Sequence, residues 1–330
     1  STPATENATR TASTTAINVQ VFIRKNSTRS FWRSRTRPTG SCGVDNRHGC
    51  GLSSREHGGD VGLTCLCMGP MRGIKVVELG IWVAGPACGG VLADWGAEVV
   101  KVEALTGDPF RGMGSFFEML TGRPENPPFE MDNRGKRSIG IDYSTPEGKG
   151  VLLDLIGTAD VFVTNLRPGA LRRAGLDHET LTARFPRLVY ASITGLGLEG
   201  PEADRASYDV GMFWSRAGVA ASLAPEGTPI PYQRGGMGDH MTGLTAAAGV
   251  AAALFERSST GRGGVVTTSL IRVGSYMMSW DLNLAMRFGF PTVAIDRAAP
   301  PNPLISSYRC ADDRWVYLLG LEGDRHWPII

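Results

Sequence analysis

The stretch GIKVVELGIWVAGPACGGVLADWGAEVVKVE, residues 73–103, decides the fold class of this chain. Its first part, Gly73–Leu79, is a short apolar run typical of a buried strand, and Ile81–Gly90 indicates a tight turn that leads into a helix. Glu98–Glu103 has the pattern of a second strand. A strand, a helix and a strand at this spacing predict two neighbouring strands of a parallel sheet.

Further units of the same kind follow along the chain. Ser138–Asp142 is a short predicted strand, and Thr145–Gly148 opens a helix with Thr as its N-cap and Pro at the first helical position. Asp160–Asn165 and Leu188–Thr194 are two more predicted strands. Such alternation predicts an α/β fold with a doubly wound, mostly parallel, Rossmann-like sheet. No GxGxxG follows the first strand, which argues against a dinucleotide site of the usual kind.

The composition limits the size and the partners of the protein. A chain of 330 residues with 42% hydrophobic content can form one large domain and part of another. The formal net charge of +2 gives no indication of a nucleic-acid partner, and the apolar runs are too short for a membrane span. Beyond residue 67 only Cys88 and Cys310 remain. This argues against a disulfide framework, and we expect a reducing, cytoplasmic location.

Residues 1–67 differ in composition from the rest, because they are rich in Ser, Thr, Arg and Gly. We expect this basic, low-complexity leader to be disordered or not native, with the natural start at Met68 or Met71. One alternative is a transit peptide, which would place the protein in mitochondria. Another is a zinc site, although the cysteine spacings match no common structural-zinc pattern. Its candidate ligands are Cys42, His48, Cys50, His57, Cys65 and Cys67.

Ligands of doubly wound sheets bind beyond the carboxyl ends of the strands. The residues expected there include Ile81–Gly85, Asn165–Gly169 and Gly195–Gly197. The Asn165 amide, with the guanidinium groups of Arg167 and Arg173, would suit a phosphorylated ligand. The alternative is that these arginines form a solvated face at a helix start, and the sequence leaves the two interpretations balanced.

Asp239 lies in the block GGMGDHMTG, residues 235–243, directly before the apolar run Leu244–Phe255. The run predicts a buried helix, so we expect the Asp239 carboxylate to accept backbone N–H bonds at the helix start and to feel the positive end of the dipole. The neighbouring glycines would let a ligand approach the backbone, and an exposed carboxylate could attack an acyl group. On this block alone, an ordinary N-cap is the simpler interpretation.

Seven sequence blocks follow one another in a definite order between residues 73 and 264. They are GIKVVEL (73–79) with AGPAC (84–88), AEVVKVE (97–103), NRGKRS (133–138) with TPEGK (145–149), NLRPGAL (165–171), SYD (207–209), GGMGDHMTG (235–243) and TGRG (260–263). In order and spacing they resemble the family III CoA-transferases, the CaiB/BaiF group that includes formyl-CoA and carnitinyl-CoA transferases. This resemblance favours a catalytic Asp239 over a plain N-cap.

The resemblance implies a transferase that moves CoA from an acyl-CoA donor to a small carboxylic acid. Asp239 would attack the thioester, form a mixed anhydride and then carry CoA as an aspartyl thioester. CoA would be part of the substrate, with no tightly bound cofactor and no metal. The residues that the resemblance assigns to the CoA site are Val83, Ala84, Asn165, Leu166, Arg167, Arg173, Arg205 and Tyr208.

Tyr208 distinguishes two activities within this family. Transferases carry a tyrosine here, whereas the racemases carry a histidine that moves the α-proton together with the aspartate. A tyrosine removes one of the two bases, so a transferase is favoured over a 2-methylacyl-CoA epimerase. His240 is a weaker candidate for the second base, because adjacent residues at a helix start point in different directions.

The chain departs from the family pattern after the second predicted strand. Some relatives place an arginine for the CoA phosphates there, but this chain has Ala104-Leu105. Arg111 or Arg205 would have to compensate.

The resemblance also implies the domain organisation. Residues 68–271 form the large CoA-binding domain, 272–297 a linker, and 298–330 the beginning of a smaller α/β domain. Family members continue past this point and form interlocked homodimers, so we expect a C-terminally truncated chain. The third alternative is therefore an inactive CoA-binding fragment.

Overall fold

The computed structural model describes residues 69–116, 125–290 and 294–329. The leader of residues 1–67, with its possible zinc ligands and transit signal, lies outside the described residues. The central sheet has six parallel strands in the order β3-β2-β1-β4-β5-β6. The predicted α/β class is confirmed. The strands are β1 Lys75–Leu79, β2 Glu98–Glu103, β3 Arg137–Gly140, β4 Val161–Thr164, β5 Val189–Thr194 and β6 Val265–Ser269.

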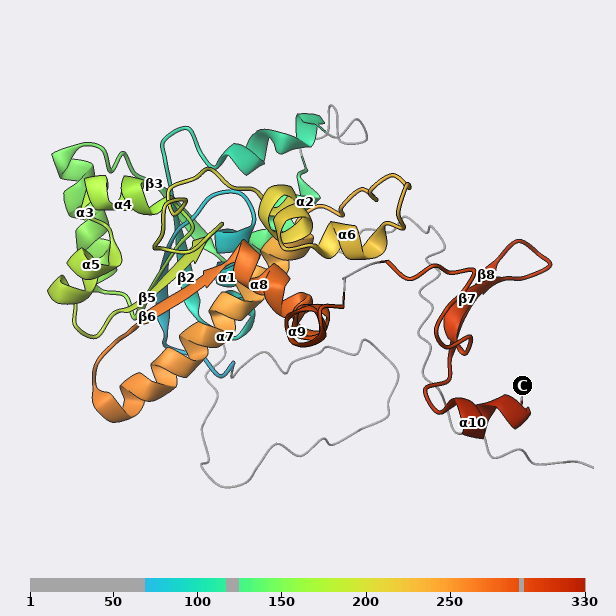
Figure 1. The fold of residues 1–330 in the computed structure, drawn as a ribbon. Helices are drawn as coiled ribbons and strands as arrows, with labels where there is room; N and C mark the ends of the chain where they lie inside the picture. Colours follow the sequence, from blue (N-terminus) through green and yellow to red (C-terminus); the bar gives the residue numbers. More distant parts are fainter. Residues whose placement is uncertain (1–68, 117–124, 291–293, 330) are drawn as a thin grey trace, which may run out of the picture. The chain divides into compact units, whose positions relative to one another are not determined.

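Helices cover both faces of this sheet (Figure 1). One face packs on α1 (Ala84–Asp94) and α7 (Met237–Thr260), in a core that takes alternate residues from β1, β4 and β5. The intervening residues point the other way and pack on α3 (Pro146–Gly157), α4 (Pro168–Ala174) and α5 (His178–Arg184). Because successive side chains of a strand alternate between faces, strands buried on both sides become continuous apolar runs, as their sequences show.

The helix starts follow the chemistry expected from the sequence. The Oγ1 atom of Thr145 accepts the Gly148 N–H at 3.1 Å, and Pro146 occupies the first position of α3. Asp177 caps α5 in the same manner, accepting the Thr180 N–H at 2.9 Å. These caps satisfy N–H groups that have no partner inside the helix.

Helices α1 and α7 approach each other closely at Gly243. A Cβ atom built on this glycine would lie 2.8 Å from the carbonyl oxygen of Ala84 and 2.8 Å from the Cβ atom of Ala87. Backbone atoms cannot move aside as a side chain can, so only glycine fits here. The contact fixes the start of α1, and with it the residues that follow β1.

The segment expected as a linker, residues 272–297, is helical over much of its length. It contains most of α8 (Leu270–Met277) and all of α9 (Ser279–Phe288). Residues 305–319 form an antiparallel pair, β7 (Ile305–Arg309) and β8 (Trp315–Leu319). The remaining elements are α2 (Pro127–Asp132), α6 (Val219–Leu223), α10 (Gly323–His326), the 3₁₀ helices Pro109–Phe116 and Trp327–Ile329, and the π-helix Val210–Arg216.

No helix in the described residues has the length and apolarity needed to span a bilayer. Nor do these residues contain a group of three His, Cys, Asp or Glu side chains placed to bind a metal ion.

Candidate functional site

A hollow of about 360 Å³ lies at the carboxyl ends of β1, β4 and β5. The strand order reverses between β1 and β4, and this is where doubly wound sheets bind their ligands. The hollow, which we call the Asp239 pocket, contains seven of the residues predicted from the sequence. They are Val83, Ala84, Asn165, Leu166, Arg167, Tyr208 and Asp239.

Asn165 shapes this pocket by holding the turn after β1. Its Oδ1 atom accepts the Ile81 N–H at 2.9 Å, and its Nδ2 atom donates to the Ile81 carbonyl at 2.8 Å. A Cβ atom on Gly85 would lie 2.9 Å from that same Oδ1 atom, which explains the glycine there. Because both ends of the amide are bonded to Ile81, Asn165 holds the pocket wall in place, and its Nδ2 atom keeps a second N–H for the phosphorylated ligand expected from the sequence.

A buried group of charged side chains also holds the turn after β1. Lys101 Nζ lies 3.1 Å from Glu78 and 2.9 Å from Asp108, and it also donates to the Gly80 carbonyl at 2.8 Å. Lys136 pairs with the second oxygen of Glu78 at 2.8 Å. Burial lowers the pKa of Lys101, but the two carboxylates outweigh it and hold the pKa above its ordinary value. The charges therefore stay paired and fix the end of β1.

Asp239 is the third residue of α7, and the N-cap is Gly236, which adopts a left-handed conformation with φ 71°. The expectation that the Asp239 carboxylate accepts backbone N–H bonds was wrong. Among the described residues none donates a hydrogen bond to it, because Asp209 accepts the N–H groups at this helix end. The Asp239 carboxylate is thereby left to face the pocket in the first turn of the helix.

Asp209 is the residue that caps α7. It is 6% exposed, and its Oδ2 atom accepts the N–H groups of Gly238 at 3.0 Å and Asp239 at 3.3 Å. Its Oδ1 atom accepts from Gln233 Nε2 at 2.8 Å. A Cβ atom on Gly238 would lie 2.3 Å from Asp209 and 2.2 Å from Phe213, so the glycine permits this capping. The cap fixes the backbone that carries Asp239.

The electrostatic environment makes Asp239 unusually basic. Burial, followed by the charge of Asp209, raises its pKa to about 7. Asp132 adds to this rise, whereas His240 opposes it. A carboxylate with a raised pKa is only half ionised near neutral pH, but its anion is a stronger nucleophile than an ordinary aspartate.

His240 points to a partner other than Asp239. Its Nε2 atom lies 2.9 Å from Asp132 Oδ1, and the residue does not line the Asp239 pocket. The hydrogen bond with Asp132 raises the pKa of His240. The geometry ties α2 to α7 and gives no support for His240 as a second base in the pocket.

Arg167 and Arg173 lie together beside the pocket. They line a small hollow of about 180 Å³ that also includes Asp204, and Arg167 lines the Asp239 pocket as well. Asp204 pairs with Arg172 at 3.1 Å and accepts the Gly169 N–H. In the part of the chain that the structure describes, neither Arg167 nor Arg173 has an ion-pair partner. The pair remains suited to an anionic group.

The other two candidate arginines are already paired. Arg205 forms an ion pair with Glu202 and does not line the Asp239 pocket. Arg111 binds Glu103 through two hydrogen bonds of 2.7 Å. Neither therefore supplies a free cation in place of the arginine that the family resemblance leads us to expect after β2.

Comparison with known proteins decides the family. The sequence model of CoA-transferase family III matches residues 71–329. The chain belongs to CoA-transferase family III. The resemblance seen in its sequence blocks is thereby confirmed.

Two curated relatives of this family III chain are named CoA-transferases. The (R)-2-hydroxy-4-methylpentanoate CoA-transferase of Clostridioides difficile is 38% identical over 255 residues, which cover 77% of this chain and 63% of that protein. The cinnamoyl-CoA:phenyllactate CoA-transferase of Clostridium sporogenes is 39% identical over 249 residues, or 74% of this chain and 60% of that one. The chain thus spans about three fifths of the length of these relatives.

A solved CaiB/BaiF family protein from Brucella suis has the same fold. It superposes with a TM-score of 0.67 at 34% identity, over 76% of this chain and 65% of that one. The parallel sheet that the sequence predicted for the family III chain is therefore also consistent with a solved structure of the family.

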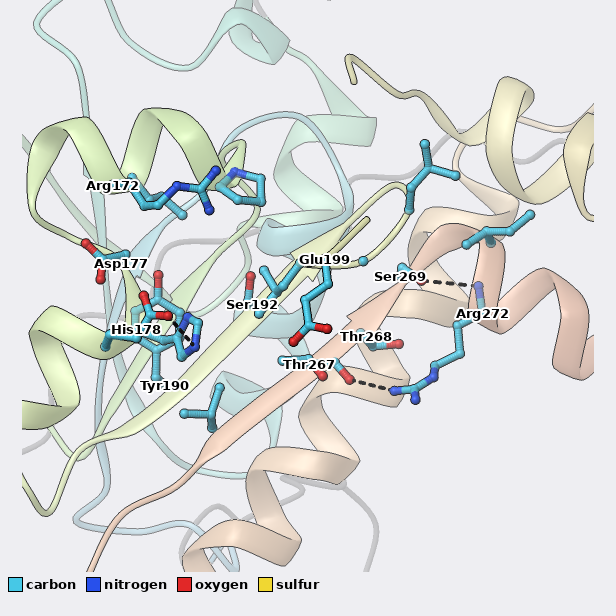
Figure 2. A pocket seen from close by; sticks show the side chains of 18 residues that line it. Arg172, Asp177, His178, Tyr190, Ser192, Glu199, Thr267, Thr268, Ser269 and Arg272 are labelled. Atoms are coloured by element: carbon cyan, nitrogen blue, oxygen red, sulfur yellow. Dashed lines mark hydrogen bonds and ion pairs between the residues drawn. The ribbon is translucent and has the colours of Figure 1, made fainter. Parts of the chain in front are cut away.

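A larger hollow of about 810 Å³ is lined by residues of β5, β6, α4 and α5 (Figure 2). Charged side chains of both signs surround it, and Arg272 donates to the Thr267 carbonyl at 3.2 Å. Arg172, also in this hollow, pairs with Asp204. Pro168 and Gly197, both in the ranges expected at the strand ends, line it, but neither Asp239 nor any residue that the resemblance assigns to the CoA site does.

Sequence reasoning missed the role of one residue that shapes this pocket. Asp209 stood inside the quoted block SYD but received no role, although a carboxylate next to the pocket tyrosine was a usable signal. Trp82 belongs to the range Ile81–Gly85 expected at the strand ends but received no role of its own, and it lines the pocket between Ile81 and Val83.

Proposed function

We propose that this chain transfers CoA from an acyl-CoA donor to a carboxylate acceptor through covalent intermediates on Asp239. The observation that carries the proposal is the Asp239 carboxylate, which faces a pocket at the strand ends with its backbone capped by Asp209. Membership of family III supports it, since relatives of the chain are named CoA-transferases.

The reaction begins when a carboxylate oxygen of Asp239 attacks the thioester carbon. The C–S bond breaks, CoA thiolate leaves, and a mixed anhydride forms. The thiolate then attacks the Asp239 carbonyl carbon, giving an aspartyl thioester and releasing the donor acid. The acceptor carboxylate attacks this thioester, forms a second anhydride and frees the thiolate. Attack of the thiolate on the acceptor carbonyl gives the new acyl-CoA and restores Asp239.

The chain's own groups support each part of this scheme. Burial and Asp209 raise the pKa of Asp239 to about 7, which strengthens the anion as a nucleophile. The start of α7 places positive dipole charge near the developing oxyanion. Arg167 and Arg173, next to the pocket, suit the phosphates of CoA. CoA enters as part of the substrate.

Association of two chains is also part of the proposal. Helix α9 buries none of its residues, and several apolar side chains of α8 and α9 are exposed, with Tyr276 at 79%, Trp280 at 80% and Met286 at 76%. Apolar surface of this kind marks interaction sites. A second copy, in a homodimer, would cover it.

Trapping with hydroxylamine tests the proposed nucleophile. The chain is incubated with an acyl-CoA, treated with hydroxylamine and digested, and we expect a hydroxamate on the peptide that contains Asp239. The Asp239→Ala variant should give none, while Asp281→Ala, an exposed aspartate of α9, should behave as the wild type. If the wild-type chain formed no hydroxamate on this peptide, the result would contradict the proposal and favour an inactive CoA-binding fragment.

The epimerase alternative needs a separate measurement. An epimerase would exchange the α-proton of an acyl-CoA in deuterated buffer without any acceptor. We expect no such exchange, because Tyr208 lines the pocket and His240 is bonded to Asp132. If mass spectrometry found deuterium at the α-carbon, the result would contradict the transferase proposal and favour the epimerase.

A further inference from the structure

Trp82 has an unusual backbone for its residue type. It is the third residue after β1, lines the Asp239 pocket and has φ 63°, a left-handed conformation that disfavours large side chains. Among the described residues, Asp313 is the one other non-glycine with positive φ. Strained conformations of this kind persist where the surrounding structure imposes them, and they concentrate at ligand sites.

Buried polar groups impose this conformation. The Trp82 N–H donates to Asp108 Oδ1 at 3.1 Å, and the other oxygen of Asp108 pairs with Lys101 at 2.9 Å. The preceding residue, Ile81, is bonded at both its N–H and its carbonyl to Asn165. Asp108 and Lys101 are 2% and 1% exposed, so the carboxylate that accepts the Trp82 N–H is held in the interior. The fixed backbone determines where the Trp82 side chain leaves the chain.

The indole ring of Trp82 lies between two other aromatic rings. Its centroid is 6.2 Å from that of Phe110, which is buried, and 6.2 Å from that of Tyr208, at an interplanar angle of 83°. Phe110 packs in turn on Phe129 at 6.2 Å. Edge-to-face pairs of this kind stabilise one another beyond their buried area. The pocket thus has an aromatic wall, formed by Trp82 and Tyr208 and supported from behind by Phe110.

The charges of the pocket restrict what can face this wall. Asp209 and Asp239 line the pocket near Tyr208, and a second carboxylate on the ligand would be repelled by them. Arg167 is the one cation among the described lining residues, and it stands at the start of α4, where we place the CoA phosphates. Ile193 and Leu270 add apolar surface, and Tyr143, Thr194 and Ser207 add hydroxyl groups to the lining. The aromatic wall and this apolar surface suit an uncharged, largely apolar acyl side chain.

We propose that Trp82 determines acyl specificity, and that the pocket selects acyl groups with an aromatic ring or a branched apolar chain over acetyl and over acids with a second carboxylate. This inference rests on the proposed function, because it concerns the acyl group that Asp239 accepts. Neither the motif blocks nor the transfer chemistry requires a tryptophan at position 82 or an apolar acyl group.

The test compares donors by single-turnover trapping on Asp239. The donors are 3-phenylpropanoyl-CoA, 4-methylpentanoyl-CoA, acetyl-CoA and succinyl-CoA, and the readout is the rate of hydroxamate formation. Trp82→Gly removes the ring and suits the left-handed backbone, so the fold should be retained. Trp82→Phe keeps an aromatic ring, and Trp315→Ala removes an exposed tryptophan of β8 as a control.

We expect the wild type to favour the phenyl and methylpentanoyl donors over acetyl and succinyl by at least about tenfold. Trp82→Gly should lose most of this preference, whereas Trp82→Phe and Trp315→Ala should keep it. Equal rates with all donors, or a preference unchanged in Trp82→Gly, overturns the inference and leaves the transferase standing. A wild-type chain that forms no adduct with any donor overturns the proposed function and this inference with it.

Discussion

Asp209 accepts the backbone N–H of Asp239 at 3.3 Å, so the residue that fixes the position of the proposed nucleophile also places a second negative charge beside it. The two effects act differently on the reaction. The hydrogen bond holds the first turn of α7 in place. The charge, together with burial, raises the pKa of Asp239 to about 7. One side chain therefore sets both the geometry and the basicity of the nucleophile.

The Asp209→Asn variant separates these two effects. Asn keeps an oxygen that accepts the N–H groups of Gly238 and Asp239 but removes the charge. The pKa of Asp239 should fall, so the rise of adduct formation with pH, centred near 7 in the wild type, should move down by about one pH unit. A pH profile of hydroxamate formation between pH 5 and 9 measures the shift. An unchanged profile would show that the charge of Asp209 has no influence.

The Asp239→Asn variant should be more stable than the wild type at alkaline pH. The folded pKa of about 7 lies above the ordinary value of 3.8, so the folded state binds the proton more tightly than the unfolded chain. Stability is lost as the pH rises between these two values, and Asn does not titrate. We expect a gain of roughly 1 to 3 kcal/mol at pH 8 and a much smaller one at pH 4.5. Urea unfolding at both pH values measures it, and equal gains would contradict the burial of a charge at this site.

The sequence predicted the site residues better than their interactions. Strands β1, β4 and β5 are buried on both faces, so each is a continuous apolar run, and the residues that follow them had to meet at one edge of the sheet. β6 was missed because its sequence VVTTS is half polar and lies directly behind a glycine-rich turn. Its place beside β5 depends on contacts far along the chain.

The other differences between the sequence-based predictions and the structure arise from the partners of the charged residues. Asp239 was placed correctly in the first turn of a helix, but its pKa depends on Asp209 and on burial, which no local pattern reports. Arg205 was expected near CoA, yet Glu202 lies three residues before it and pairs with it. That spacing is readable in a sequence and would have weakened the assignment.

Arg167 and Arg173 should contribute to CoA binding, and Arg205 should not. Substitution of either of the first two by Ala should raise the Kd for CoA about tenfold, because each removes a charge-assisted bond to phosphate. The Arg205→Ala variant is the matched control, since its guanidinium is paired with Glu202 outside the pocket. Isothermal titration at two salt concentrations measures both the affinity and its salt dependence. Equal losses in all three variants would refute the assignment.

Gly243 should be hard to replace, because it lies where the two helices that position the pocket make backbone contact. An added Cβ atom would lie 2.8 Å from the Ala84 carbonyl and 2.9 Å from the Cys88 nitrogen, and these backbone atoms belong to the start of α1. Gly243→Ala must push α1 away from α7. We expect a loss of about 2 to 4 kcal/mol in the free energy of unfolding. CoA binding should weaken too, because Val83 and Ala84 line the pocket.

Gly150 offers the matched control for this substitution. It lies inside α3, and no atom comes within 4 Å of a Cβ built on it. Gly150→Ala should therefore stabilise the chain by about 0.5 to 1 kcal/mol, through the higher helix propensity of alanine. Urea unfolding and CoA titration of both variants measure the contrast. If Gly243→Ala were as stable as Gly150→Ala and bound CoA like the wild type, the close contact of α1 and α7 would not determine the pocket.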